Sequence, residues 1–261
     1  MEYEGVVFDL DGTVYRGGEL LPGAAAALDR VRADGAAVLF FSNNPTKSRA
    51  AYVERLRGFG LDVVESEVLS AGTITTRYLV AEHSGDATFL VGSEGMFDQL
   101  ESAGIRLAET PTAADVLVVS WDDGFDYHDM KDGYRALANG ATFYGTDPDR
   151  IVPASGGRMV PGSGAIINAV GGVLQREPEK ILGKPSAEAQ LAALEALDAP
   201  PERCLVVGDR LNTDIALGER AGMTTVLVRT GVTTDADLAD SDVSPDHVID
   251  SLADLGTILG L

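Results

Sequence analysis

The sequence predicts an α/β protein with a doubly wound parallel sheet, into which a second, smaller α/β domain is inserted. Short apolar runs alternate along the chain with longer amphipathic segments, and this pattern indicates parallel strands joined by helices. Hydrophobic residues make up 45% of the chain and aromatic residues 6%, so we expect a core of aliphatic side chains. A chain of 261 residues is long enough for one large domain or two modest ones.

The first series of predicted elements lies toward the two ends of the chain. We expect strands at residues 5–9, 37–42, 204–209 and 224–229, and helices at residues 24–33, 47–58 and 187–197. Each strand ends in, or just before, a polar residue or a glycine-rich turn. Open α/β sheets bind ligands beyond the carboxyl ends of their strands, so the candidate chemistry lies there.

A second series occupies the middle of the chain, with strands expected at residues 88–91, 116–121 and 142–144 and helices at residues 94–103 and 129–139. This series is enough for a small sheet of its own, and it does not repeat the first. We therefore predict a core domain in two pieces, residues 1–78 and 182–261, with an inserted domain at residues 79–181.

The charge of the chain is strongly unbalanced, with 41 acidic and 20 basic residues and a net charge of −21. Such a surface repels nucleic acid and anionic membranes, so we expect neither as a partner. Few of the basic residues are lysines: Lys47, Lys131, Lys180 and Lys184. We interpret this composition as halophilic adaptation, because molar salt screens repulsion between carboxylates; an ordinary acidic cytosolic protein is the alternative.

The single cysteine, Cys204, excludes an intramolecular disulfide framework and a multi-cysteine zinc site. It lies in an apolar run, so we expect a buried strand residue. No stretch approaches the roughly 18 consecutive apolar residues of a membrane span. The first residues lack the basic region of a signal peptide, and we therefore expect a cytoplasmic protein.

The first candidate site is the segment Asp9-Leu10-Asp11-Gly12-Thr13, which follows the first predicted strand. Two carboxylates this close repel each other, and a divalent cation makes the arrangement favourable. With a metal present, one carboxylate can attack phosphorus while the other acts as a general acid. The alternative is an ordinary Asp-Gly turn after a buried strand.

Ser42-Asn43-Asn44-Pro45 ends the second predicted strand. Hydroxyl and backbone N–H donors at a turn from strand to helix suit a phosphoryl oxygen. Taken alone, the segment is better explained as a helix cap, where serine and asparagine are favoured.

Lys184 lies in the triplet Gly-Lys-Pro, just ahead of an amphipathic helix. A lysine in such a turn can bridge a nucleophilic carboxylate and a phosphate, which otherwise repel each other. A solvated loop lysine is the alternative, but it has less weight in a chain that otherwise avoids lysine.

The segment 206–214 supplies another carboxylate, Asp209, at a strand end, and Asp214 follows five residues later. Asp209 can complete a metal site opposite Asp9. Asp214 can hold metal-bound water or Lys184 without binding the metal itself. Asp214 can also cap the helix expected at residues 215–221.

Together, these four strand-end motifs resemble the haloacid dehalogenase (HAD) superfamily, and the resemblance covers the whole chain. Within it, Ser42-Asn43-Asn44, Gly-Lys-Pro, Gly-Asp-Arg-Leu-Asn-Thr-Asp and the central insertion look like the NagD or p-nitrophenyl phosphatase branch with its type IIA cap. The resemblance implies a Rossmann-like HAD core and a phosphate monoester hydrolase that acts on a small phosphorylated metabolite.

The resemblance also implies a role for each motif residue. Asp9 is the nucleophile that forms an aspartyl-phosphate, and Asp11 is the general acid and base. Mg²⁺ is bound by the side chains of Asp9 and Asp209 and by the main-chain carbonyl of Asp11. Ser42, Asn43 and Lys184 hold the phosphoryl oxygens. Residues 14–21, with Gly17-Gly18, are predicted to form a β-hairpin, which is a flap beside the active site in the family.

In this family the cap selects the leaving group, so Asp122, Tyr127 and Asp147 are candidates for specificity, although solvated loops explain each of them better. The segment Gly-Thr-Asp-Pro-Asp departs from the Thr-Asn-Pro-Asp expected of the branch, which leaves the role of Asp147 open. Pro161-Gly162-Ser163-Gly164 is too short for a dinucleotide motif, and we expect a helix entry there. The histidines His83, His128 and His247 show no metal-ligand spacing, and we assign them no role.

Three other functions are compatible with parts of this pattern. A phospho-accepting signalling receiver also uses an acidic cluster, a hydroxyl and a lysine, but its acceptor lies on a later strand and a long insertion is not expected. A phosphotransferase or mutase on the same fold is not excluded by the sequence. A binding protein with vestigial catalytic residues is disfavoured, because all the motif residues are present. The substrate and the oligomeric state stay open. The resemblance implies that, if the chain forms a homodimer, its contacts lie on the cap.

Overall fold

The computed structural model describes residues 3–153 and 158–260. The chain forms two compact units, which are described separately. The core unit comprises Met1–Ser42, Arg49–Leu69 and Ala189–Leu261, and the inserted unit comprises Asn43–Ser48 and Ser70–Glu188. None of the helices in the described part of the chain has the length and apolar composition needed to cross a membrane.

The core sheet has six strands in the order β14-β13-β12-β1-β4-β5. Their bounds are β1 Gly5–Phe8, β4 Ala37–Ser42, β5 Val68–Ser70, β12 Cys204–Gly208, β13 Thr224–Val228 and β14 His247–Ile249. β1 pairs in parallel with β12 on one side and with β4 on the other. The strand order therefore reverses at β1, and the carboxyl ends of β1 and β12 lie side by side at this switch point, where open α/β sheets bind ligands.

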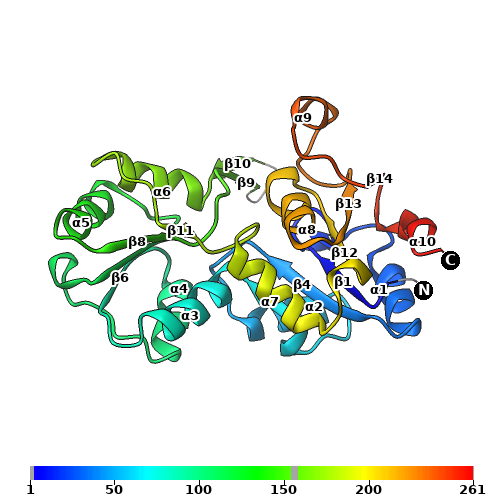
Figure 1. Cartoon of the computed structure of the whole chain (residues 1–261), viewed down its shortest axis with the longest axis horizontal. Helices are drawn as coiled ribbons and strands as arrows, with labels where there is room; N and C mark the ends of the chain where they lie inside the picture. Colours follow the sequence, from blue (N-terminus) through cyan, green and yellow to red (C-terminus); the bar gives the residue numbers. More distant parts are fainter. Residues whose placement is uncertain (1–2, 154–157, 261) are drawn as a thin grey trace. The chain divides into compact units, whose positions relative to one another are not determined.

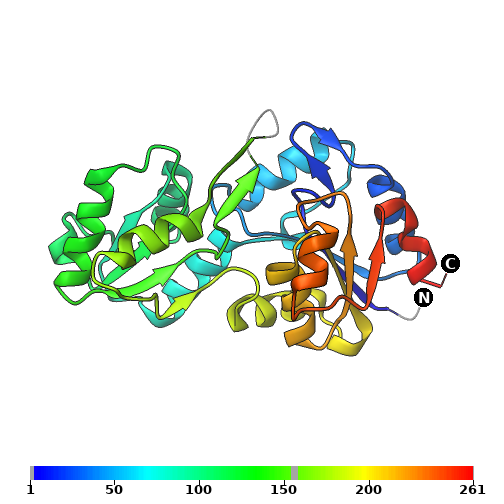
Figure 2. The same ribbon diagram turned by 90° about the horizontal axis from the view of Figure 1, so that it is seen from above.

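Helices cover both faces of the core sheet, as predicted. On one face, α1 (Ala24–Ala33), α2 (Arg49–Gly58) and α10 (Leu255–Ile258) contribute buried aliphatic residues to the main hydrophobic cluster. Figure 2 shows α1 and α10 side by side. On the other face lie α7 (Ala187–Leu197) and α8 (Ala216–Ala221). A methyl group at Gly218 of α8 would lie 2.3 Å from Val206 of β12, so glycine is needed for this close packing.

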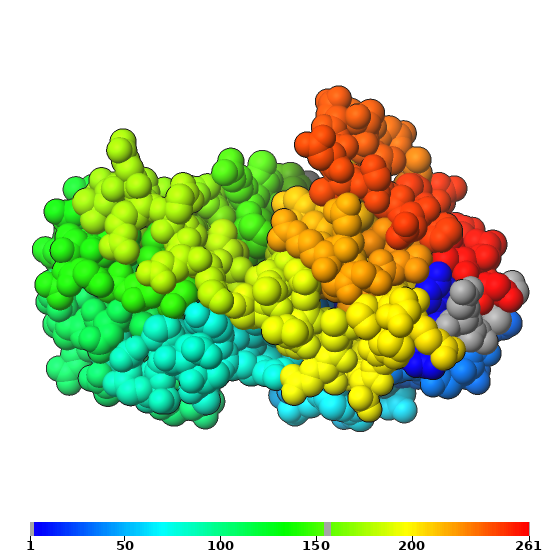
Figure 3. Space-filling model, viewed as in Figure 1, coloured from blue at the N-terminus to red at the C-terminus, as the bar shows by residue number. Residues whose placement is uncertain are grey.

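Smaller elements complete the core unit. The predicted hairpin at residues 14–21 is present, as the antiparallel strands β2 (Tyr15–Arg16) and β3 (Glu19–Leu20). A π-helical turn at Leu211–Ile215 precedes α8, and α9 spans Asp235–Asp240. No residue of α9 is buried, and Figure 3 shows its segment protruding from the core unit. Single 3₁₀ turns lie at Glu65–Glu67, Pro201–Arg203 and Leu252–Asp254 of this unit, and another lies at Pro111–Ala113 of the inserted unit.

The inserted unit has its own parallel sheet, in the order β11-β8-β7-β6. The bounds are β6 Thr88–Val91, β7 Val116–Val119, β8 Thr142–Gly145 and β11 Lys180–Ile181. Figure 1 shows this sheet between two helix pairs: α5 (Tyr127–Ala138) with α6 (Ser163–Gly172), and α3 (Ala71–Glu82) with α4 (Glu94–Ser102). An antiparallel hairpin, β9 (Ile151–Pro153) and β10 (Met159–Pro161), leads into α6.

Two predicted elements of the inserted unit differ from the structure by two residues at one end. The strand expected at residues 116–121 ends at Val119. The helix expected at residues 129–139 begins at Tyr127, because the Asp126 carboxylate accepts hydrogen bonds from the backbone N–H groups of His128 and Asp129 and so caps its first turn.

Candidate active site

Asp9 and Asp11 follow directly from β1, whose four residues are all buried. The backbone N–H of Asp9 donates to the carbonyl of Val207, which continues the pairing with β12 past the end of β1. Asp9 is itself 8% exposed, whereas Asp11 is half-buried. The sheet therefore delivers the predicted nucleophile to a nearly enclosed position at the switch point.

Asp209 follows β12 and is held by the loop that comes after β13. The backbone N–H of Val232 donates to Asp209 Oδ2 over 2.8 Å, and the Thr233 hydroxyl donates to the Asp209 carbonyl over 2.6 Å. A methyl group at Gly231 would lie only 1.9 Å from Asp209 Oδ2, and one at Gly12 would lie 2.6 Å from it. Both glycines are thus required for the backbone to pass this close to the carboxylate.

Asp214 braces the loop that carries Asp209. Its Oδ2 accepts hydrogen bonds from the backbone N–H groups of Asp209 and Arg210, over 3.2 and 3.1 Å. It sits in the π-helical turn before α8, and α8 begins without a side-chain cap. These two hydrogen bonds of Asp214 thus hold the loop that precedes it.

The side chains of Asp9, Asp209 and Asp214 form a cluster in which each offers one oxygen within 4.8 Å of the others, and all three are buried. Buried carboxylates this close repel each other unless a cation neutralises them. Oxygen ligands of this kind suit a hard divalent cation, so the donor set fits the metal expected from the sequence. Within the described residues, the cluster does not include the Asp11 side chain, which fits the expected use of its main-chain carbonyl.

The Asp11 side chain instead contacts Tyr15. The Tyr15 hydroxyl donates to Asp11 Oδ2 over 3.2 Å. Burial, and then the charge of Asp11, raises the pKa of Tyr15 well above the usual value for a phenol, so the hydroxyl keeps its proton. No pattern in the sequence singles out this tyrosine.

Ser42 ends β4, where it is almost fully buried. The hydroxyl of Tyr52, from α2, donates to Ser42 Oγ over 3.2 Å. Burial raises the pKa of Tyr52 above its ordinary value, so Tyr52 too remains a donor.

Asn43 and Lys184 are brought together within the inserted unit although 141 residues separate them. The Lys184 backbone N–H donates to Asn43 Oδ1 over 2.8 Å, and Asn43 Nδ2 donates to the Lys184 carbonyl over 3.1 Å. A methyl group at Gly183 would lie 2.8 Å from both Asn43 Oδ1 and the Thr146 carbonyl, so this position of the Gly-Lys-Pro turn needs glycine. Lys184 is 1% exposed, unlike a solvated loop lysine. Two of the predicted motifs are thus joined by a pair of hydrogen bonds.

The three cap candidates have different surroundings. Asp122 Oδ1 accepts from the backbone N–H of Gly124 and forms a local turn, and Tyr127 is 70% exposed at the start of α5. Asp147 is 2% exposed, unlike a residue of a solvated loop.

The surroundings of Asp147 perturb its titration. The Thr146 hydroxyl lies 3.1 Å from Asp147 Oδ2, and the backbone N–H of Asp149 donates to Oδ1 over 3.2 Å. Burial and, second, the neighbouring carboxylate of Asp149 raise the pKa of Asp147 to about 8.

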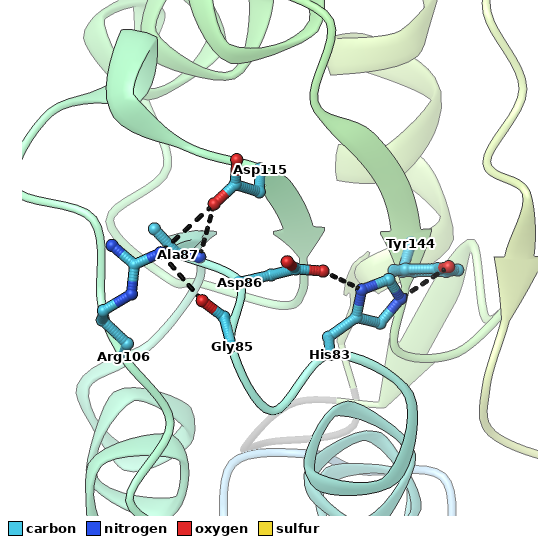
Figure 4. Close-up of polar contacts among 7 residues, drawn as sticks. All are labelled: His83, Gly85, Asp86, Ala87, Arg106, Asp115 and Tyr144. Atoms are coloured by element: carbon cyan, nitrogen blue, oxygen red, sulfur yellow. Dashed lines mark hydrogen bonds and ion pairs between the residues drawn. The ribbon is translucent and has the colours of Figure 1, made fainter.

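Figure 4 shows the contacts of His83, to which the sequence assigned no role. Its Nδ1 lies 2.7 Å from Asp86 Oδ2 and its Nε2 lies 3.0 Å from the Tyr144 hydroxyl. Nearby, Asp115 accepts from the backbone N–H of Ala87 and from Arg106. These contacts link the end of α3 to β8, and the start of β6 to β7, so we interpret both groups as structural.

Two further expectations are confirmed. Cys204 is buried in β12, and burial raises the pKa of its thiol to about 11. The segment around Gly162 is a helix entry, with Gly162 at the N-cap of α6.

Comparison with known proteins extends over nearly the whole chain. A family model described as haloacid dehalogenase-like hydrolase matches residues 6–106, and another, described as HAD-hydrolase-like, matches residues 181–255. The sugar-phosphatase AraL of Bacillus subtilis is 33% identical over 96% of this chain and 91% of its own length. The p-nitrophenyl phosphatase from Archaeoglobus fulgidus superposes with a TM-score of 0.91 at 35% identity, covering 98% of this chain and 99% of that one. NagD from Escherichia coli K-12 gives a TM-score of 0.85 at 28% identity, covering 97% and 98%.

Proposed function

Because this chain belongs to the haloacid dehalogenase-like hydrolases, in the branch of NagD and the p-nitrophenyl phosphatases, we propose that it is a Mg²⁺-dependent phosphatase that works through an aspartyl-phosphate on Asp9. Its substrates are small phosphorylated metabolites in which the phosphate is a monoester. Similarity to a sugar phosphatase and to a p-nitrophenyl phosphatase supports this substrate class.

The single observation that carries the proposal is the cluster of buried carboxylates from Asp9, Asp209 and Asp214 at the switch point of the core sheet. Two glycines, Gly12 and Gly231, let the backbone pass right against Asp209, and the backbone N–H of Val232 holds its Oδ2. This arrangement favours a cation held by carboxylates.

The proposed reaction uses the two carboxylates that follow β1. An Asp9 oxygen attacks phosphorus while the bond from phosphorus to the ester oxygen breaks, and Asp11 donates a proton to that oxygen, so that a neutral alcohol leaves. Water then attacks the phosphorus of the aspartyl-phosphate as Asp11 takes one of its protons. The bond to Asp9 breaks, phosphate is released, and both carboxylates return to their starting states.

The remaining motif residues bind charge. We assign Ser42, Asn43 and Lys184 to the phosphoryl oxygens, and the side-chain amide of Asn43 also bonds the Lys184 backbone. Asp9, Asp209 and the Asp11 carbonyl would hold Mg²⁺, which when bound would supply the positive charge that lets an anionic nucleophile approach an anionic ester. Asp214 keeps the Asp209 loop in place.

The experiment is a panel of phosphate monoesters assayed with Mg²⁺ and with a chelator, in low and in molar potassium chloride, for wild type and Asp9→Asn. We expect Mg²⁺-dependent phosphate release that Asp9→Asn abolishes. Asp29→Asn is the matched control, because Asp29 is exposed on α1. Hydrolysis that survives Asp9→Asn would refute the mechanism. Adding a second alcohol as acceptor separates a hydrolase from a phosphotransferase, since only the latter forms a new ester.

A further inference from the structure

A buried tyrosine contacts the proposed general acid. Tyr15 is 1% exposed, and its hydroxyl donates to Asp11 Oδ2 over 3.2 Å, while Asp11 itself is only half-buried. All of these groups lie in the core unit. The partly exposed carboxylate is therefore anchored at one oxygen by a residue that solvent does not reach.

The Tyr15 ring is held by two side chains, and its backbone is also bonded. The guanidinium carbon of Arg55 lies 4.2 Å from the ring centroid, and the Phe59 ring centroid lies 5.5 Å away. Arg55 also donates to the Gly17 carbonyl over 2.6 Å and so ties α2 to the hairpin. The backbone N–H of Gly12 donates to the Tyr15 carbonyl over 2.8 Å. The phenol is thus held in place relative to the Asp11 loop.

This contact distinguishes the two oxygens of Asp11. A carboxylic acid carries its proton on one oxygen and accepts hydrogen bonds on the other. With the phenolic proton lying on the line between Tyr15 and Oδ2, the proton that Asp11 transfers is favoured on Oδ1. The hydrogen bond also restricts rotation of the carboxyl group, and proton transfer depends on such alignment.

We propose that Tyr15 is a positioning residue, which orients Asp11 so that Oδ1 presents the proton to the departing oxygen of the ester. The inference rests on the proposed function, in which Asp11 is the general acid. Arg55 acts one step further out, by holding the Tyr15 ring against the hairpin.

The test uses the basicity of the leaving group. A general acid matters most when the departing oxygen is basic, as in a hexose phosphate, and least when it is a nitrophenolate. We therefore measure kcat/KM for p-nitrophenyl phosphate, phenyl phosphate and a hexose phosphate at saturating Mg²⁺. This parameter reports only the steps up to release of the alcohol, so the later activation of water does not affect it.

For Tyr15→Phe we expect kcat/KM to fall by about tenfold or more on the hexose phosphate and by less than about threefold on p-nitrophenyl phosphate, with phenyl phosphate between them. Asp11→Asn should lower kcat/KM by larger factors, with the three esters in the same order. A loss by the same factor on all three esters, or no loss on any, would overturn the inference.

Two further variants make the test specific. Tyr52→Phe removes a buried phenol that contacts Ser42, and it should lower kcat/KM by the same factor for every ester. Arg55→Met keeps an apolar contact with the Tyr15 ring but removes the hydrogen bond to Gly17. Its losses in kcat/KM should follow the same order of esters as those of Tyr15→Phe, but each loss should be smaller. If melting shows that Tyr15→Phe is unfolded, the ranking for Arg55→Met decides. Activity in Asp9→Asn defeats the proposed function itself, whereas an inactive Asp9→Asn with unranked losses in Tyr15→Phe defeats only this inference.

Discussion

Gly231→Ala is the substitution for which the structure gives the most specific expectation at the proposed metal site. The added methyl carbon would lie 1.9 Å from Asp209 Oδ2 and 2.0 Å from Asp209 Cβ, whereas real contacts of this kind are not shorter than 3.0 Å. Rotating the carboxylate away does not relieve the contact with Cβ. Asp209, or the segment at Gly231 whose neighbour Val232 holds Asp209 Oδ2, must therefore move by about 1 Å, several times the tolerance of about 0.2 Å for a metal ligand.

We expect a shift of this size to lower kcat/KM by roughly a hundredfold and to raise the Mg²⁺ concentration for half-maximal activity. The assay is a Mg²⁺ titration of phosphatase activity, with melting curves to show that the fold is retained. Gly256→Ala is the matched control, because a methyl group at Gly256 of α10 meets nothing within 4 Å. Wild-type activity and Mg²⁺ dependence in Gly231→Ala would refute the placement of the metal beside Asp209.

Four other outcomes are expected. First, the pKa of Asp147 is raised in the folded protein to about 8, so its contribution to stability is fully present below about pH 4 and is lost as the pH rises to about 8, by at most about 1.4 kcal/mol per pH unit. Asp147→Asn removes this titration, so its stability relative to wild type in urea unfolding should increase from pH 5.5 to 7.5; a constant difference would contradict the assignment. Second, Asn43→Ala removes two buried hydrogen bonds to the N–H and carbonyl of Lys184, so it should lower the free energy of unfolding by roughly 2–3 kcal/mol and raise KM for every ester. Asn168→Ala, on the exposed face of α6, should change neither the free energy of unfolding nor KM. Third, a chelator should lower the melting temperature and Mg²⁺ should restore it, because the carboxylate cluster then lacks its counter-charge; an unchanged melting curve argues against a bound cation. Fourth, circular dichroism after dialysis into low salt should show loss of structure if the charge of −21 reflects salt adaptation, and full retention would exclude it.

The strands that position the site could be predicted because they are buried and carry a strong signal. β1, β4 and β12 are apolar runs followed at once by polar residues, so both the strands and their functional ends are visible in the sequence. By contrast, β5 and β14 have three residues each and lie at the edges of the sheet, where the apolar run is too short to stand out.

The helix α3 was not predicted, and its composition explains why. Its sequence AGTITTRYLVAE contains a glycine and several β-branched residues, which have low helix propensity. The helix begins at an N-cap, Ser70, whose side chain accepts from the backbone N–H of Thr73. Packing in the folded unit and this cap outweigh the local preference.

The contacts that refine the site depend on residues far apart in the chain. The pairing of Asn43 with Lys184, and the approach of Gly231 to Asp209, leave no local pattern in the sequence. Asp147 is followed by proline and a second aspartate, as in many exposed turns, so its burial could not be foreseen either. What the sequence does contain is the identity of the reacting groups; how they are held comes from the fold.

The central claim, that Asp9 becomes phosphorylated during turnover, is tested most directly by trapping. Enzyme quenched in acid during hydrolysis of a phosphate ester is reduced with borohydride, which converts an aspartyl-phosphate to homoserine, and is then mapped by peptide mass spectrometry. We predict homoserine at residue 9 and at no other aspartate, and none when the ester is omitted. Turnover without any modification of Asp9, or with the modification on another aspartate, would contradict the account.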